Sequence, residues 1–184
     1  KITNQAGLLK EKGIPMRKME LWAKEVTSGD AMNHEARAAV YYWEKLFNIE
    51  GFTRQQKGLP PNNLLNYGYA ILRGITARAI VSSGMLPTLG IFQRKKYNAY
   101  CLADDIMEPF RPLVDEKVFE IIKQYEEQDL NTKIKADLLQ ILTRTVYFED
   151  EKSPLMVALQ KTASSLQQCY TGERKKIKYP KLWT

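Results

Sequence analysis

Three carboxylates and one arginine lie within eight residues of the sequence, in the segment 97–115 (YNAYCLADDIMEPFRPLVD). On a helical wheel, Asp104, Asp105, Glu108 and Arg111 share one arc, and apolar residues fill the other. Like charges one and four positions apart repel one another and oppose folding. A divalent cation between the carboxylates removes that cost. The segment therefore indicates either a metal site with oxygen ligands or a solvated acidic face at a helix end.

Two prolines interrupt this acidic segment. Pro109 and Pro112 each lack a backbone N–H, and each ring clashes with the preceding helical turn. We therefore expect the regular helix to bend or stop near Glu108.

Glu35 is a fourth carboxylate in an unusual position. It belongs to a helix predicted over about 34–47, for which Asn33 is a plausible N-cap. The wheel places Glu35 beside the apolar residues Ala39 and Tyr42. A carboxylate that faces a core must be paired, neutral or metal-bound, because a lone buried charge costs on the order of several kcal/mol. The alternative is that Glu35, in the first helical turn, only complements the helix dipole.

The chain is basic, with a formal net charge of +7. This charge favours a polyanionic partner, and nucleic acid is the first candidate. The positions predicted to contact DNA are Arg54, Lys57, Arg78, Arg94, Lys95 and Lys96. The first two lie in a Gly/Pro-punctuated loop, where surface charge often serves only solvation. Arg78 lies on an apolar helix face and is either a core ion pair or a phosphate clamp. Basic and acidic groups side by side suit an enzyme that attacks DNA phosphodiesters through a metal.

The remaining composition narrows the class of protein. A length of 184 residues fits one domain, and no apolar run is long enough to span a membrane. Cys101 and Cys169 have no metal-binding spacing and are expected to be reduced thiols, as in a cytoplasmic protein. The single histidine, His34, excludes a conventional zinc site. Any metal should be a hard cation with oxygen ligands.

The hydrophobic periodicity predicts an all-α domain over 1–184, with no convincing strand pattern. Residues 1–13 read as the end of a truncated helix, and 172–184 read as a basic C-terminal tail. The segment 62–83 is apolar nearly all round and is expected to be the buried central helix, in which Gly68 and Gly74 let neighbours approach closely. Further helices are expected over about 14–27, 34–47, 116–127, 132–147 and 153–170.

Five phrases of this sequence resemble the catalytic helical domain of the CRISPR-associated integrase family, that of the first Cas protein (Cas-one), in the form found in type II systems. They are TSGDAMNHEARAAVYYWEKLF at 27–47, LNYGYAILR at 65–73, SGMLPTLGI at 83–91, YNAYCLADDIMEPFRPLVD at 97–115 and LQKTASSLQQCYTGERKKIKYP at 159–180. They cover essentially the whole chain in order, which makes the set specific. The resemblance implies that the family's N-terminal β-rich domain is absent from this chain.

The resemblance also implies a site. In the family, a Glu, a His and a second acid bind Mg²⁺ or Mn²⁺. The family Glu falls on Glu35, the second acid on Glu108 with Asp105 one turn earlier, and a basic residue on Arg111. The catalytic residues implied are therefore Glu35, Glu108 and Arg111, and the metal ligands are Glu35, Gln93 and Glu108.

Gln93 stands where the family has its histidine, so this chain departs from the pattern. An amide carbonyl oxygen can still ligate a hard cation. The resemblance therefore leaves two hypotheses: an active metal-dependent integrase and endonuclease, or a catalytically impaired DNA-binding or scaffold domain of the same family. A generic helical interaction domain is a third, which requires the acid cluster to be accidental.

The activity implied by the family is CRISPR adaptation, in which the 3′-OH of a prespacer DNA fragment joins the CRISPR repeat by transesterification. No enzyme nucleophile is required. The implied partners are double-stranded DNA, a dimer of the second Cas protein (Cas-two) and a second copy of the full-length protein. The implied location is the prokaryotic cytoplasm, without membrane association.

Overall fold

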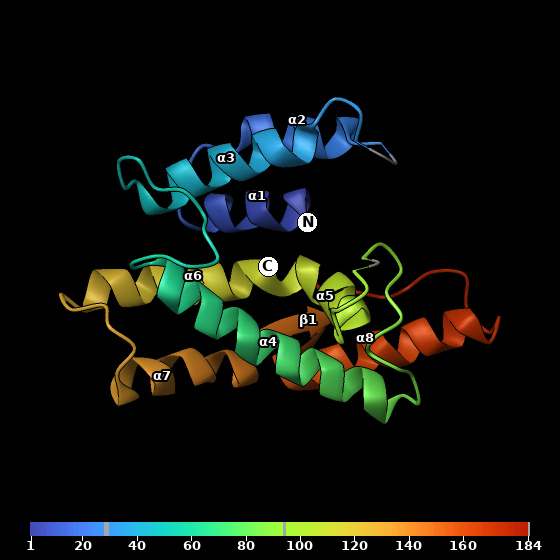
Figure 1. The fold of residues 1–184 in the computed structure, drawn as a ribbon. Helices are drawn as coiled ribbons and strands as arrows, with labels where there is room; N and C mark the ends of the chain where they lie inside the picture. Colours follow the sequence, from blue (N-terminus) through green and yellow to red (C-terminus); the bar gives the residue numbers. More distant parts are fainter. Residues whose placement is uncertain (28–29, 94, 184) are drawn as a thin grey trace.

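The computed structural model describes residues 1–27, 30–93 and 95–183, and it is mostly helical (Figure 1). The helices are α1 (Ile2–Glu11), α2 (Arg17–Glu25), α3 (His34–Phe47), α4 (Asn62–Ser82), α5 (Cys101–Met107), α6 (Arg111–Gln124), α7 (Thr132–Leu139) and α8 (Leu155–Tyr170). Two short 3-10 turns, η1 (Glu108–Phe110) and η2 (Gln140–Thr143), and a hairpin of β1 (Thr145–Phe148) and β2 (Glu151–Pro154) complete the fold. The predicted all-α class is confirmed, with this hairpin as the one small exception in the described chain.

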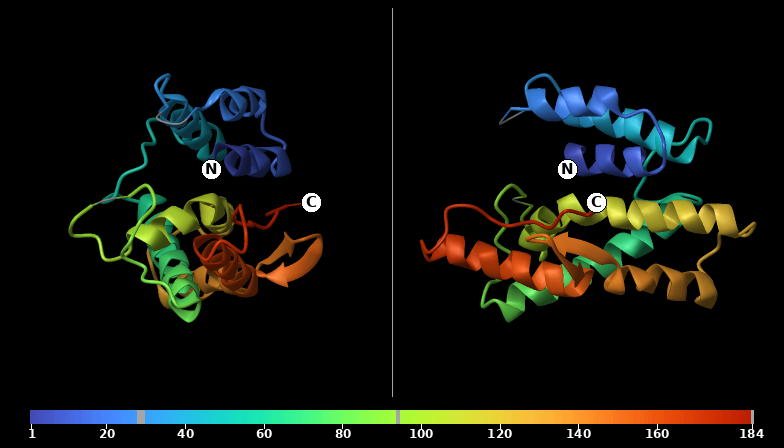
Figure 2. Two further views of the ribbon diagram at one scale, coloured as in Figure 1. Left: turned by 90° about the vertical axis from the view of Figure 1, so that its right-hand side faces the viewer. Right: turned by 180° about the vertical axis from the view of Figure 1, so that it is seen from behind.

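The helices form two packed groups. Helices α1, α2 and α3 lie together over α6, and the other helices lie below (Figures 1 and 2). Each group has its own core: a small one around Leu8, Met19 and Tyr42, and a large one around α4. The aromatic rings of Trp43 and Trp183 pack against both cores and join them.

Helix α4 is the centre of the large core, as its nearly continuous apolar sequence predicts. It contacts α5, α6, α7 and α8. At Gly68, an added Cβ would lie 2.4 Å from Cγ1 of Val114, so glycine is required for α6 to approach. The same expectation is wrong for Gly74, where an added Cβ would meet nothing within 4 Å. Within the described chain, neither α4 nor any other helix is long and apolar enough to cross a membrane.

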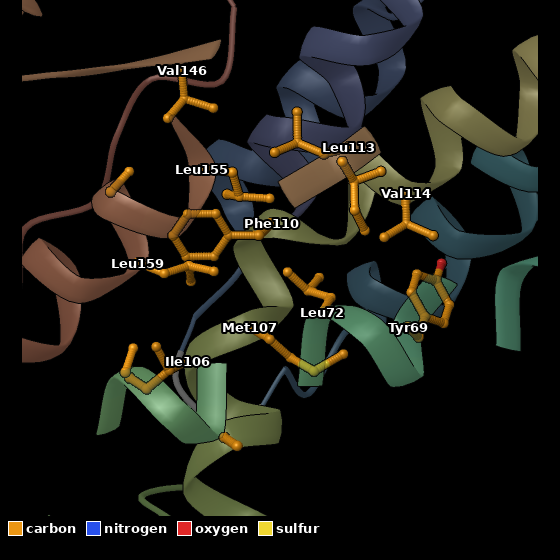
Figure 3. Close-up of a cluster of buried hydrophobic side chains, with 14 of the residues drawn as sticks. Tyr69, Leu72, Ile106, Met107, Phe110, Leu113, Val114, Val146, Leu155 and Leu159 are labelled. Carbon is orange, nitrogen blue, oxygen red and sulfur yellow. The ribbon is translucent and has the colours of Figure 1, made fainter. Parts of the chain in front are cut away.

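The acidic segment breaks where its prolines predict. Helix α5 ends at Met107, η1 takes over at Glu108, and α6 starts at Arg111. Phe110 in the turn is fully buried and points into the large core with Leu155 and Leu159 of α8 (Figure 3). The core thus anchors the break, which fixes the directions of the polar side chains on its other face.

Helix α3 has the predicted bounds, but its cap differs from the prediction. Asn33 adopts a left-handed conformation and makes no side-chain capping bond. Asp30 caps the helix instead, because its carboxylate accepts the N–H groups of His34 and Glu35, both at 2.8 Å. A carboxylate at this end also complements the helix dipole.

The helix predicted over 132–147 is partly wrong, because a β-hairpin begins at Thr145, whereas the helix predicted over about 153–170 is confirmed as α8. The segment TVYF at 145–148 carries β-branched and aromatic residues that favour a strand. Glu149 and Asp150 both have positive φ, as two-residue hairpin turns require. The basic tail packs on this hairpin: Tyr147 and Lys181 exchange two backbone hydrogen bonds, and Leu182 is buried.

Candidate active site

Glu108 and Arg111 face each other across the break between α5 and α6. Nη2 of Arg111 forms an ion pair with Oε1 of Glu108 at 2.9 Å, and both side chains are about a quarter exposed, at 27% and 26%. The other carboxylate oxygen, Oε2, is buried and accepts no hydrogen bond from the described residues, although Nζ of Lys1 lies 3.5 Å away. Nε of Arg111 is likewise buried without an acceptor. A buried oxygen and a buried N–H therefore remain available to a ligand at this place.

Glu35 lies at the start of α3 and is exposed, so the inward orientation expected from the wheel is wrong. The buried stripe of α3 is offset by one residue, since it consists of His34, Ala38, Tyr42 and Leu46. Glu35 is not among the described residues that line the pocket of Glu108, although Ala39, one turn further along α3, does line it.

Asp104 is engaged in a separate structural contact. Its side chain is 4% exposed and forms a two-pronged ion pair with Arg73, with Nε to Oδ1 at 2.7 Å and Nη2 to Oδ2 at 3.1 Å. Asn98 donates a further hydrogen bond to Oδ2 at 2.8 Å. Arg73 on α4 compensates the charge of this acid, and no shared cation is required.

Asp105 holds the loop that carries Gln93. Its carboxylate accepts the backbone N–H groups of Ile91, Phe92 and Gln93, at 2.6, 2.8 and 3.2 Å. The turn is tight at Gly90, where an added Cβ would lie 2.2 Å from the carbonyl oxygen of Gln93. Asp105 therefore fixes the backbone at position 93. It does so with its carboxylate, which the helical wheel placed in the same arc as Glu108.

The structure places Gln93 away from the pocket of Glu108. Gln93 lines a pocket of about 720 Å³ together with Lys95 and Lys96, whereas Glu108 lines one of about 140 Å³ together with Lys1 and Arg111. In residues 1–27, 30–93 and 95–183, no three His, Cys, Asp or Glu side chains gather as a metal-ligand group. Glu108 has the chemistry to ligate a hard cation, because its Oε2 lacks a hydrogen-bond partner.

The residues predicted to contact DNA occupy three places. Lys57, Arg78, Lys95 and Lys96 are exposed, so the alternative of a core ion pair at Arg78 is wrong. Arg54 is half-buried and lines the pocket of Glu108. Arg94 lies outside the described residues. Among the described members of this set, only Arg54 lines the pocket of the candidate active site.

Sequence reasoning missed Asp115, which is buried under the same pocket. It accepts hydrogen bonds from the hydroxyl of Tyr42 at 2.6 Å and from that of Tyr69. Burial raises the pKa of Asp115 to about 7, although both hydroxyls and the charges of Arg111 and Arg54 act to lower it. The pKa values of both tyrosines are raised well above their usual range, first by burial and then by the Asp115 charge. No spacing signals this cluster, since its members come from three different helices.

The fold matches that of two solved protein structures. A casposase, described as bound to integration product, aligns with a TM-score of 0.75 over 96% of this chain and 58% of its own, at 20% identity. A Cas1 protein from Thermotoga maritima aligns with a TM-score of 0.78 over 93% of this chain and 62% of its own, at 19% identity. At such identities the likeness is one of fold.

Sequence comparison identifies the family. The model of the CRISPR associated protein Cas1 matches residues 6–150, and the chain belongs to this family. A relative described as CRISPR-associated endonuclease Cas1, from Neisseria meningitidis, is 38% identical over 99% of this chain. Another, from Pyrobaculum aerophilum, is 32% identical over 78% of this chain. The chain spans 60% and 50% of these two relatives' lengths. The resemblance seen in the sequence is thereby confirmed.

Proposed function

We propose that this chain is the helical catalytic domain of a DNA integrase and endonuclease that acts in CRISPR adaptation. The observation that carries the proposal is the break between α5 and α6, where Glu108 keeps a buried carboxylate oxygen without a hydrogen-bond partner beside Arg111. Glu35, near the start of α3, is the proposed second carboxylate, as the family resemblance implies. The family match over 6–150 includes all three residues.

The proposed reaction is transesterification. The 3′-OH of a DNA fragment attacks a phosphodiester of the CRISPR repeat, a new P–O bond forms, and the 3′-oxygen of the repeat strand leaves. The protein must position two DNA ends and stabilise charge on the attacked phosphate, and it supplies no nucleophile of its own. Nε of Arg111, buried without an acceptor, is a suitable donor to an oxygen of that phosphate.

Glu35 and Glu108 would hold a divalent cation, Mg²⁺ or Mn²⁺, with Gln93 as the proposed third ligand. A cation bound there activates the attacking hydroxyl and offsets charge on the phosphate. Glu108 contributes its unpartnered oxygen, and its other oxygen orients Arg111. Asp105 fixes the backbone of Gln93 through three N–H bonds. The proposed partners are double-stranded DNA, a dimer of the second Cas protein and a second copy of the full-length protein.

A second function is favoured by one specific observation. Gln93 replaces the histidine expected in the family, and it lines a different pocket from Glu108. If the amide does not complete the site, the chain is a DNA-binding or scaffold domain that lacks turnover.

A DNA cleavage and strand-transfer assay with end-labelled DNA and Mn²⁺ separates the two functions. We expect Glu108→Ala to abolish product, because it removes the carboxylate that adjoins Arg111. Glu127→Ala is the matched control, since Glu127 is an exposed carboxylate beyond the end of α6. Equal rates for the parent and Glu108→Ala would refute catalysis at this site, and no product from any variant would favour the scaffold.

A further inference from the structure

Three arginines converge on a pocket of about 460 Å³ beside the candidate active site. Arg54 comes from the loop before α4, Arg73 from α4 and Arg111 from the start of α6. The rest of the lining includes the side chains of Gln55, Gln56, Asn66, Tyr69 and Met107. Among the described residues that line this pocket there is no carboxylate.

Arg54 is held rigidly although its loop has no regular structure. Its guanidinium donates to Oδ1 of Asn62 at 3.0 Å and to Oδ1 of Asn66 at 2.7 Å. The same two asparagines tie down the loop, because Asn62 binds the backbone on both sides of Arg54 and Asn66 donates to the carbonyl of Gln56 at 2.7 Å. Residues 62 and 66 are one helical turn apart on α4, so the helix itself positions this arginine.

The ring of Tyr69 lies next to the guanidinium groups of both Arg54 and Arg111. The guanidinium of Arg111 lies 4.6 Å from the ring centroid, and that of Arg54 lies 5.3 Å from it. The hydroxyl of Tyr69 donates to buried Asp115, which fixes the ring. A guanidinium that lies over a ring can still donate hydrogen bonds in its own plane, as Arg54 does to Asn62 and Asn66.

The charges of this pocket do not cancel. Arg73 is paired with Asp104 and Arg111 with Glu108, but neither carboxylate lines the pocket. Arg54 has only neutral acceptors within the described chain: two amide oxygens and the carbonyl of Gln55. A pocket with at least one uncompensated guanidinium and several amide donors is suited to a phosphate group.

We propose that this pocket binds one backbone phosphate of DNA, next to the phosphate that reacts at Glu108. Arg54, Tyr69 and Arg111 line both this pocket and that of Glu108, so they form the wall between the two. A strand that crosses this wall places successive phosphates on its two sides. The inference rests on the proposed function, because it takes the strand at Glu108 to be DNA, and it adds Arg73 to the residues predicted to bind phosphate.

The test measures DNA affinity in EDTA, so that it does not depend on metal or on turnover. Fluorescence anisotropy of a labelled duplex is recorded over a range of salt concentrations for the 184-residue chain, Arg54→Gln and the control Arg17→Gln. Arg17 is exposed on α2, outside this pocket, and its loss changes the net charge equally. We expect Arg54→Gln to weaken binding about tenfold. It should also lower the slope of log affinity against log salt by about 0.9, the value for one phosphate.

A second variant distinguishes a loss of phosphate binding from a folding defect. Arg73→Lys keeps the positive charge beside Asp104 but removes the planar fork, and we expect it to weaken binding severalfold more than Arg17→Lys. Equal effects of each pocket variant and its control would overturn the proposal.

Free phosphate is the other possible ligand of this pocket, and titration with inorganic phosphate, followed by ³¹P NMR, tests whether it binds there. Phosphate binding that requires Arg54, with unchanged DNA affinity in Arg54→Gln, would overturn the assignment to DNA. If Arg54→Gln weakens DNA binding but the parent gives no strand transfer, the pocket stands and the proposed reaction fails.

Discussion

Asp115 makes the stability of this fold depend on pH. Its pKa rises from an ordinary value of 3.8 to about 7, because burial outweighs the hydroxyls of Tyr42 and Tyr69 and the charges of Arg111 and Arg54. Between these two pH values the folded chain holds a proton that the unfolded chain has released. The free energy of unfolding therefore falls as pH rises, by up to about 1.4 kcal/mol per pH unit.

The perturbation that isolates this effect is Asp115→Asn, which keeps an acceptor oxygen for one of the two tyrosine hydroxyls and removes the titrating group. The stability of the parent minus that of Asp115→Asn should fall by about 3 kcal/mol between roughly pH 4.5 and pH 8. The measurement is urea unfolding at a series of pH values. Glu151→Gln, at an exposed strand position, is the control and should give a pH-independent difference. A flat difference for Asp115→Asn would refute the argument that burial controls this carboxyl group.

Further predictions concern the elements that position the site. Gly68→Ala should destabilise the chain by about 1–3 kcal/mol, because its Cβ would meet Val114 at 2.4 Å, whereas Gly74→Ala, in open space on the same helix, should stabilise it by up to about 1 kcal/mol. Urea unfolding compares the two, and equal effects would contradict the packing described here. Asp30→Ala should cost about 1 kcal/mol, because it removes the cap of α3, and an unchanged unfolding midpoint would show that the cap contributes nothing.

Local patterns were enough to predict the helices that carry the site. The apolar periodicity gave α3 and α4 nearly to the residue, and the two prolines located the break at Glu108. These features depend on neighbours within a few positions along the chain. The β-hairpin was missed because its four-residue strands are too short to show a period beside two strongly helical segments.

The partners of charged residues could not be predicted in the same way. Asp104, Asp105 and Glu108 share an arc of the wheel, but each finds a different partner: Arg73, the loop before Gln93, and Arg111. A helical wheel predicts the direction in which a side chain points, but not which residue it meets in that direction. Asp115 is the extreme case, since its hydrogen-bond donor Tyr42 is 73 positions away in the sequence.

Glu35 shows that a helical wheel can predict burial wrongly at the end of a helix. The prediction that it belongs with Glu108 came from the family resemblance and stays a prediction. The prediction that it is buried was wrong, because α3 turns His34 and Ala38 to the core. An offset of one residue is enough to move a carboxylate from the core to solvent.

The most direct test of a metal-dependent site is calorimetric titration of Mn²⁺ into the parent chain, Glu35→Ala, Glu108→Ala and Gln93→His. The account predicts that the parent binds Mn²⁺, that each alanine variant loses binding because it removes a carboxylate ligand, and that Gln93→His binds at least as tightly as the parent. Binding by Gln93→His alone would contradict an active site in this chain and favour the scaffold. Equal binding by the parent and both alanine variants would remove Glu35 and Glu108 from the site altogether.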